Sequence, residues 1–519
     1  MKRILYGILA VLILIVSGCS SNTVQQTEPT LTTEPSASIQ TDTPSATPTA
    51  TPQPKYPTIE NNQAEEPNTF SLGVTLNDAE HKLIVTQNLI YHNNTGTELD
   101  EIYFNLIPQA FQKDGGGIDM QDIFISDQKC SMEQVKETVY KIALPSSLGK
   151  TEQIDIAMEY EVKIPNIQNR FGYQENVFNL GNFIVTPAVY GADGWVIEPY
   201  VDIGDAFYTD IANYDVTIQV PEGYIVAATG EEVSQGSYHA ANVRDFAFCA
   251  SDSYETISDI WEDVAITVYY GDHMTQTAQR VIDCAKKSLE LYSEKFGKYP
   301  YTTLRIVMSG LTGGVNGMEY PTLIMISPEI ALESLSDVFG VDPSDSSTVE
   351  AYMVPLDTSV CHEIAHQWFY GVVGNDQISE PWLDEGLCRY AEYLYQKAYP
   401  PQISEDSGVY LMADRLRDRY IMVSGEGGEE GMGYAPDTTD LNLSLYDWIN
   451  DNPMDYSEIY DKGASLIYEM EQQMGEDAFD QAMQEYVQHF AYRFVTKDTF
   501  QEFWSSKADF SKLFALYLS

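Results

Sequence analysis

Basic residues are scarce in this chain. Its 519 residues include 28 Lys and Arg against 78 Asp and Glu, which gives a formal net charge of −50 at pH 7. A surface with this charge repels the phosphate backbone of nucleic acids and the headgroups of anionic lipids, so the composition argues against both as partners of the folded surface. Two interpretations of the charge remain open: a strongly hydrated exterior, or a preference for cationic substrates.

Cysteine is scarce as well. Six cysteines are present, and Cys19 belongs to an N-terminal segment that is treated separately below. The other five form an odd and widely spaced set, which is not typical of a disulfide framework. The 44% of hydrophobic residues instead indicate a globular protein over most of the chain. The five cysteines are Cys130, Cys249, Cys284, Cys361 and Cys388.

Long hydrophobic runs are absent except at the N-terminus. Lys2 and Arg3 precede the apolar run Ile4–Val16, which is short for a membrane-spanning helix. This pattern predicts an export signal over residues 1–18, with an uncleaved signal anchor or an ordinary transmembrane helix as the alternative. The small residues before Cys19 resemble a bacterial lipobox, and the resemblance implies cleavage there and a lipid on the cysteine. We therefore expect a lipid-anchored protein on the extracytoplasmic side of the cell membrane.

Residues 19–59 are dominated by Ser, Thr, Pro and Gln. The run TPSATPTATPQP contains hardly any large side chain that a core could bury. Such a composition predicts a disordered linker, and its prolines favour extended conformations. This linker would hold the folded part away from the membrane.

Residues 60–270 show the alternation of β-strands. Every second residue of Ile154–Ile164 is apolar, and Val216–Val220 repeats the pattern before a Pro-Glu-Gly turn. A period of two is that of a strand with one buried face, so these runs predict a curved sheet or a sandwich. No residue here is a candidate for catalysis, since the histidines lack ligand spacing and are predicted to be surface or packing residues. They are His81, His92 and His239.

The periodicity changes near Gly271. Apolar residues at helical spacing from Ala278 to Tyr292 predict a helix that ends before Gly297. Two short apolar strands, 304–308 and 323–326, flank a glycine-rich turn, and Glu319 follows that turn. Alone, Glu319 is typical of a solvated loop carboxylate. Its position upstream of the motif described next favours a functional role.

An H-E-x-x-H motif is formed by His362, Glu363 and His366. On a helix, residues four apart lie on one face, so the two imidazoles can bind one tetrahedral ion. Glu363, one step around the helix, would lie beside the open coordination position and take a proton from the attacking water. The motif predicts a zinc site with its own general base. Cys361 and Cys388 flank it, and we interpret both as packed small residues.

Three short motifs follow one another in the second half of the chain: Gly317-Met318-Glu319, His362-Glu363-x-x-His366 and Trp382-Leu383-Asp384-Glu385-Gly386. Between His366 and Glu385 lie 18 residues. In this order and spacing the motifs resemble those of the aminopeptidase N family of gluzincin zinc metallopeptidases. Further matches are FGKYP at Phe296–Pro300 and YDKGA at Tyr460–Ala464 in the second half, and FNLIP at Phe104–Pro108 and DFAF at Asp245–Phe248 in the first. Together they extend the resemblance over nearly everything beyond the linker.

The resemblance implies an α+β fold. An N-terminal antiparallel β-sandwich or saddle domain over residues 60–270 would precede a mainly helical, thermolysin-like catalytic domain over residues 271–519. His362, His366 and Glu385 would bind one Zn²⁺ per chain.

The remaining roles also come from the resemblance. Glu363 would activate water, and Tyr460 would donate a hydrogen bond to the tetrahedral intermediate, with Tyr456 as the weaker candidate. Glu319, within the substrate-binding motif that includes Gly317 and Met318, would hold the α-ammonium group of a substrate. Two more acids, Asp384 and Glu392, would either orient the ligands or be ordinary helix-face charges.

Three features leave questions open. Tyr320 stands where the family usually has Asn, and Asp384 replaces a more usual Asn, so either residue could alter specificity. The Gly- and Glu-rich stretch 424–433 could be a mobile loop near the cleft or a plain surface insertion.

The resemblance as a whole implies a zinc-dependent aminopeptidase that acts on peptides with a free N-terminus. The alternatives are a zinc endopeptidase, a zinc hydrolase of another substrate, and a non-catalytic binding module on a peptidase scaffold. The last is disfavoured because the ligands, the base and Glu319 are all present.

Overall fold

The computed structural model describes residues 55–63, 65–311, 315–339, 346–404, 407–425, 440–451 and 456–518. They belong to one compact unit, Pro54–Ser519. The expected signal segment 1–18, Cys19, the linker up to residue 54 and most of the stretch 424–433 lie outside the described residues. Among the described residues, no helix combines the length and apolar character needed to cross a bilayer.

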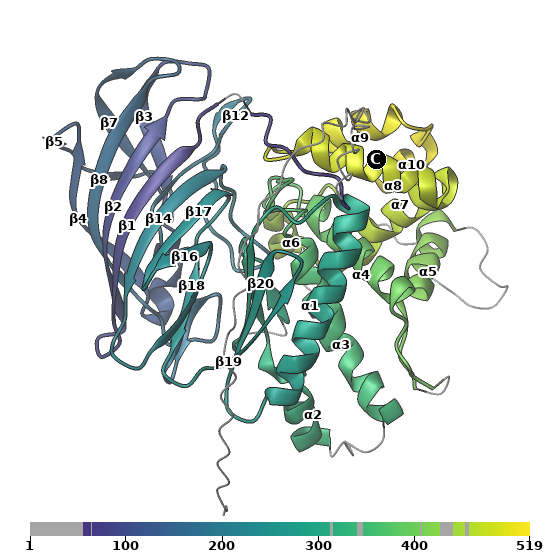
Figure 1. Cartoon of the computed structure of the whole chain (residues 1–519). Helices are drawn as coiled ribbons and strands as arrows, with labels where there is room; N and C mark the ends of the chain where they lie inside the picture. Colours follow the sequence, from purple (N-terminus) through teal and green to yellow (C-terminus); the bar gives the residue numbers. More distant parts are fainter. Residues whose placement is uncertain are drawn as a thin grey trace, which may run out of the picture. The chain divides into compact units, whose positions relative to one another are not determined.

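An eight-stranded sheet forms most of the first half of this unit (Figure 1). Its strands pair antiparallel, except that β1 pairs parallel with β14. In β8 the apolar residues from Ile156 to Val162 are buried and alternate with more exposed ones, as the period-two pattern predicts. The strands, in sheet order, are β16 (Glu231–Ser234), β17 (Ser237–Val243), β14 (Ala212–Gln219), β1 (Asn68–Asn77), β2 (Lys82–His92), β8 (Gln153–Lys163), β4 (Gly117–Ile125) and β5 (Gln128–Lys129).

Two four-stranded sheets complete the β half. Both contribute to a core that they share with the large sheet. One consists of β15 (Ile225–Ala228), β18 (Phe248–Ser251), β10 (Val177–Leu180) and β9 (Phe171–Gln174). The other consists of β11 (Thr186–Pro187), β3 (Leu99–Asn105), β7 (Val139–Leu148) and β6 (Glu133–Gln134), while β12 (Tyr190–Gly191) and β13 (Gly194–Trp195) pair with each other and a 3₁₀ helix, η1, covers Ile107–Asp114.

A five-stranded mixed sheet connects the β half with the helical half. It contains β19 (Glu255–Trp261), β20 (Val264–Tyr270), β21 (Thr303–Met308), β23 (Leu323–Ile326) and β22 (Gly317–Met318) in this order. The expected domain boundary at residue 270 passes through this sheet, because β20 pairs directly with β21. The short edge strand β22 carries the first of the three motifs and fixes it against β23.

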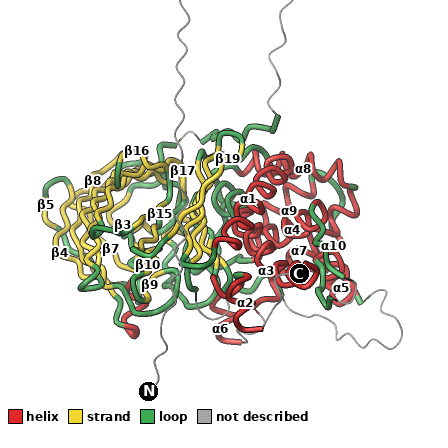
Figure 2. The backbone as a smooth tube through the Cα atoms, turned by 60° about the horizontal axis from the view of Figure 1, so that its bottom comes forward, coloured by secondary structure: helices red, strands yellow, loops and turns green. Residues whose placement is uncertain are grey.

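Helices form most of the remaining chain, so the two halves have the predicted α+β arrangement (Figure 2). The first helix, α1 (Thr275–Phe296), buries the apolar stripe predicted from Ala278 to Tyr292 and ends at Gly297. The others are α2 (Leu332–Phe339), α3 (Ser346–Ala365), α4 (Trp382–Ala398), α5 (Met412–Ser424), α6 (Leu445–Asp451), α7 (Glu458–Met474), α8 (Glu476–Phe490), α9 (Lys497–Ser505) and α10 (Ser511–Tyr517), with a 3₁₀ turn, η2, at Pro328–Ile330.

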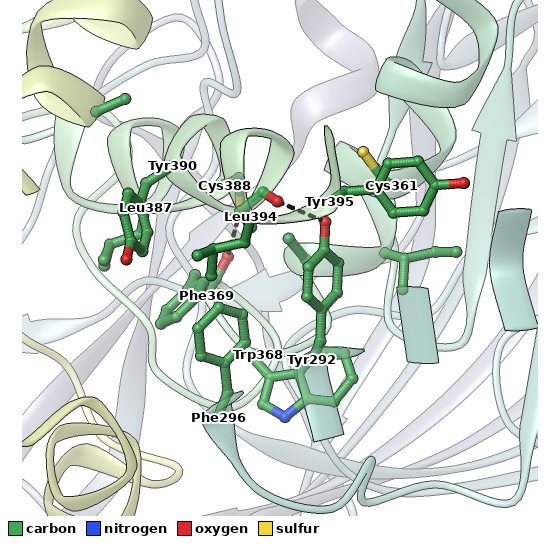
Figure 3. Close-up of a cluster of buried hydrophobic side chains, with 14 of the residues drawn as sticks. Tyr292, Phe296, Cys361, Trp368, Phe369, Leu387, Cys388, Tyr390, Leu394 and Tyr395 are labelled. Carbon is green, nitrogen blue, oxygen red and sulfur yellow. Dashed lines mark hydrogen bonds between the residues drawn. The ribbon is translucent and has the colours of Figure 1, made fainter. Parts of the chain in front are cut away.

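An aromatic cluster holds α1, the end of α3 and α4 together (Figure 3). Tyr292 and Trp368 meet edge to face, and the Tyr292 hydroxyl donates to the carbonyl oxygen of Ala391 at 3.0 Å. Cys361 and Cys388 belong to this cluster and are buried and free, as predicted for packed residues. The cluster fixes the two helices that carry the zinc-binding motifs against each other.

Candidate metal and catalytic centre

The three predicted ligands come from two adjacent helix ends. His362 lies in the last turn of α3, His366 directly follows that helix, and Glu385 lies in the first turn of α4. The Nε2 atoms of His362 and His366 are 3.1 Å apart, and they lie 3.1 and 3.5 Å from Oε2 of Glu385. An ion with ligand distances of about 2.0–2.2 Å in a tetrahedron places its ligand atoms roughly 3.4 Å apart. The three buried side chains therefore fit a zinc ion.

The other nitrogen of each imidazole is held by an acceptor. Nδ1–H of His362 donates to Oε1 of Glu392 at 2.8 Å, and Nδ1–H of His366 donates to the carbonyl oxygen of Phe369 at 3.0 Å. Carboxylates and carbonyls only accept, so both Nδ1 atoms carry the proton and both Nε2 lone pairs are left for a metal. Glu392, whose role the sequence left open, thus orients a ligand.

Glu363, the predicted base, is buried next to the edge strand β22. Gly317 approaches it so closely that a Cβ at this position would overlap the Glu363 carboxylate. Burial raises the pKa of Glu363 to about 7, against the opposing effect of His362 and His366. A divalent cation held by the two histidines would lower that pKa again. Because Gly317 has no side chain, β22 can pack directly against the carboxylate of Glu363.

Glu319 lies in the same cavity, almost completely buried. Burial raises the pKa of its carboxyl well above the usual range, and the charge of Asp205 adds to this effect. Within the described residues it forms no ion pair with a Lys or Arg side chain; its side-chain hydrogen bond is accepted from Nε2 of Gln377 at 3.3 Å. A buried carboxylate without a cation is costly, so this site favours a positively charged ligand group.

Asp384 supports Glu319 rather than the metal ligands. Its Oδ2 accepts a 2.8 Å hydrogen bond from Gln377, the residue that also donates to Glu319, and its Oδ1 accepts from Asn375 at 3.0 Å. Of the two acids for which the sequence left a ligand-orienting role open, Glu392 contacts a ligand and Asp384 does not. The acid at position 384 is connected to Glu319 instead, through Gln377.

Tyr320, the other departure from the family pattern, does not line the cavity. It is fully buried, and its hydroxyl donates to Oδ1 of Asn182 in the β half at 3.2 Å. Gly181 provides the space, since a Cβ there would overlap the Tyr320 ring. The residue therefore anchors the segment that follows Gly317-Met318-Glu319 to the β half.

Tyr460 stands beside the predicted metal site. Its hydroxyl donates to Oε1 of Glu385 at 2.8 Å. The helices that carry these residues approach closely at Gly386 and Gly463, where a Cβ on either would lie 2.9 Å from Cα of the other. Tyr456 is packed against Gly204 instead. The contact with the ligand favours Tyr460 as the hydrogen-bond donor in catalysis.

The β half lines part of the cavity, and two of its lining residues form an ion pair that the sequence did not indicate. Asp205 and Arg170 both line the cavity, and Nη1 of Arg170 lies 2.5 Å from Oδ1 of Asp205. Burial raises the pKa of Asp205, while Arg170 opposes that shift. Both lie outside the regular strands, so no periodicity pointed to them. Residues 60–270 therefore contribute to the wall of the cavity, which has a volume of 960 Å³. That none of them is catalytic stays a prediction.

Comparison with known families agrees with this geometry. Residues 280–516 match the peptidase family M1 domain. The match covers a little under half of the chain. The matched residues include all three motifs, among them Gly317-Met318-Glu319, and Tyr460.

Curated relatives align with part of this chain at low identity. The chain is 26% identical to aminopeptidase M1-D of Oryza sativa over 233 residues, which are 44% of this chain and 23% of that protein. It is 30% identical to human aminopeptidase N over 158 residues, covering 29% of this chain and 15% of the relative. The matched region thus spans at most about a quarter of the length of these two relatives.

Solved structures share the fold over most of the described chain. A zinc M1 metallopeptidase from Deinococcus radiodurans is similar with a TM-score of 0.59 at 16% identity, covering 89% of this chain and 94% of that one. A point mutant of an M1 zinc metallopeptidase from the same organism, bound to the substrate Tyr-Ser-Ala, gives a TM-score of 0.55 at 17% identity, with coverages of 89% and 94%. These similarities extend beyond residues 280–516 into the β half and confirm the fold class.

Proposed function

We propose that this protein is a zinc-dependent aminopeptidase with one Zn²⁺ per chain, which hydrolyses the first peptide bond of peptides with a free N-terminus. The observation that carries the proposal is the buried Glu319 carboxylate, which has no Lys or Arg partner within the described residues and shares a cavity with His362, His366 and Glu385. An α-ammonium group at Glu319 would place the first peptide bond of a substrate next to the three ligands. The names of the curated relatives support the same activity.

In this mechanism each site residue has a distinct task. Glu319 binds the substrate's α-ammonium, with Gln377 and Asp384 holding the carboxylate in place. Zinc, when bound, lowers the pKa of a water molecule and polarises the substrate carbonyl. Glu363 accepts the proton of the attacking water and passes it to the leaving amine. The Tyr460 hydroxyl turns from Glu385 to the developing oxyanion and donates a hydrogen bond to it.

The proposal is tested with a panel of aminoacyl fluorogenic substrates and matched peptides, each with a free or an acetylated N-terminus. We expect turnover of the free substrates, loss of turnover in a chelator, and recovery when zinc is added back. Acetylated peptides should be cleaved at least about 100-fold more slowly, because they offer Glu319 no charge. Equal hydrolysis of both forms would indicate an endopeptidase, and no turnover of any peptide would favour the non-catalytic binding module.

We also propose that the protein is a lipoprotein anchored to the extracytoplasmic face of the cell membrane through Cys19. The support is the sequence alone: the export signal, the small residues before Cys19 and the Pro-rich linker after it. We expect the wild type in the membrane fraction and the Cys19→Ala variant in the soluble fraction after cell lysis. Cys130→Ala is the matched control and should stay with the membranes. Membrane partitioning of Cys19→Ala would contradict the lipid anchor.

A further inference from the structure

The cavity continues beyond the metal ligands along one face of α4. Four residues of this helix line it, and their spacing of four, three and four residues places them on one face: Glu385, Arg389, Glu392 and Gln396. At 1.5 Å per residue, Arg389 lies about 6 Å and Gln396 about 16 Å beyond Glu385. Glu319 lies at the opposite end, where Gln377 connects it to Asp384. A substrate held by its N-terminus at Glu319 would therefore run toward Arg389 and Gln396.

Arg389, the first arginine on this path, has its charge satisfied by the protein. Its Nε donates to Oδ1 of Asp461 at 2.8 Å, and its Nη1 donates to both carboxylate oxygens of Glu392 at 3.0 and 2.7 Å. Glu392 in turn accepts from His362. Arg389 therefore belongs to the support of the metal ligands and has little capacity left for a substrate.

Arg415, on α5, lines the same wall of the cavity, and the described residues pair its charge only weakly. Its one ion pair within the described residues is a 3.5 Å contact between Nη1 and Oδ2 of Asp461. Its Nε is buried without a hydrogen-bond acceptor, while 38% of the side chain is exposed. The guanidinium packs over the ring of Tyr410 at 5.7 Å. A ligand cannot reach the buried Nε, but the exposed part of the side chain lines the cavity and has only this one long ion pair in the described part of the chain, so a ligand carboxylate can still add hydrogen bonds to the guanidinium.

The position of Arg415 limits the length of such a ligand. Asp461 links it to Arg389, and the backbone N–H of Met412, at the start of α5, donates to Oε1 of Gln396 at 2.9 Å. These contacts place Arg415 near the stretch of α4 that runs from Arg389 to Gln396. Each extended peptide residue spans about 3.3–3.6 Å, so two residues beyond the scissile bond cover roughly 7 Å. That distance brings the C-terminus of a tripeptide into this region.

We propose that Arg415 binds the C-terminal carboxylate of short peptides, which makes tripeptides the preferred substrate class of this site. The inference rests on the aminopeptidase activity proposed above. A guanidinium presents paired N–H donors that match a carboxylate, and every unmodified short peptide carries this group. In a chain with a net charge of −50, an anionic terminus is bound only where a cation is provided locally. Glu319 and Arg415 would thus bind the two ends of one substrate.

The test compares tripeptides X-Gly-Gly and X-Gly-Gly-amide, where X is the best residue of the aminoacyl panel. The full chain and its Arg415→Gln variant are assayed, together with Arg417→Gln as the matched control. Arg417 lies on the same helix, is 60% exposed, pairs with Asp414 and does not line the cavity. We expect the wild type and Arg417→Gln to show a kcat/KM at least about tenfold higher for the free acid than for the amide. Arg415→Gln should lose this preference through a higher KM while retaining the turnover of the amide.

The outcomes separate the inference from the proposed function. Equal hydrolysis of acid and amide by the wild type, or an equal loss on both in Arg415→Gln, would overturn the role of Arg415 while leaving the aminopeptidase intact. A preference for free hexapeptides over their amides as large as that for tripeptides would overturn the assigned length. If X-Asp-Gly-amide were hydrolysed as fast as X-Gly-Gly, Arg415 would bind side-chain carboxylates rather than the C-terminus. No turnover by the wild type on any of these peptides or on the aminoacyl panel would contradict the proposed function itself.

Discussion

Replacing Glu363 by Gln should reduce kcat by roughly 10²–10⁴-fold, the range that a positioned general base contributes. Gln has nearly the same shape, so its packing against Gly317 is retained. It cannot accept the proton of the attacking water, because its amide is not basic. The three ligand side chains are untouched, and the variant should therefore still bind one zinc per chain. Steady-state kinetics and metal analysis of the same preparation measure both effects.

The control for Glu363→Gln is the same change at Glu255, which is exposed on β19. Glu255→Gln should leave kcat, KM and zinc content unchanged. Wild-type turnover in Glu363→Gln with a full complement of zinc would exclude Glu363 as the base. Loss of zinc together with activity would instead assign Glu363 to metal binding.

Local patterns in the sequence are sufficient to predict that the two histidines of the candidate metal site converge. The spacing of His362 and His366 on a helix predicts their convergence, because helical geometry fixes it within one turn. The third ligand, Glu385, was assigned from the family spacing, and the structure places it 3.1 Å from His362. The helix α1 and the strands of the β half followed from periodicity in the same way.

Contacts between distant segments could not be predicted in this way. Asp205 reaches the cavity from an irregular segment of the β half, about 160 residues before the first predicted histidine ligand. It belongs to no periodic pattern and to no motif. The Tyr320 side chain can point into the β half because Gly181, in another part of the fold, has no side chain to occupy that space. The side chain of Asp384 turns to Gln377 rather than to the metal ligands, although it precedes Glu385 in sequence. In each case the partner is defined only by the tertiary structure.

Replacing Glu319 by Gln should reduce kcat/KM for peptides with a free N-terminus by roughly 100-fold, mainly through KM. The buried carboxylate has no Lys or Arg partner within the described residues, so the substrate's ammonium supplies the countercharge, and losing one member of a buried charge pair costs about 2–5 kcal/mol. Gln keeps the length of the side chain and can still accept the hydrogen bond from Gln377. Kinetics on free and acetylated forms of one peptide measure the effect.

The acetylated peptide distinguishes recognition of the ammonium from general damage to the site. It carries no charge for position 319 to bind, so its already slow hydrolysis should be nearly the same in the wild type and in Glu319→Gln. Asp384→Asn is the matched control: it removes a neighbouring acid but leaves the Glu319 charge, and it should produce a smaller rise in KM through Gln377. Equal losses on both peptide forms would mean that Glu319 shapes the cavity rather than binds the N-terminus. A selective loss on the free peptide requires a charge at position 319, because the side chains of Glu and Gln differ little in shape but differ in charge.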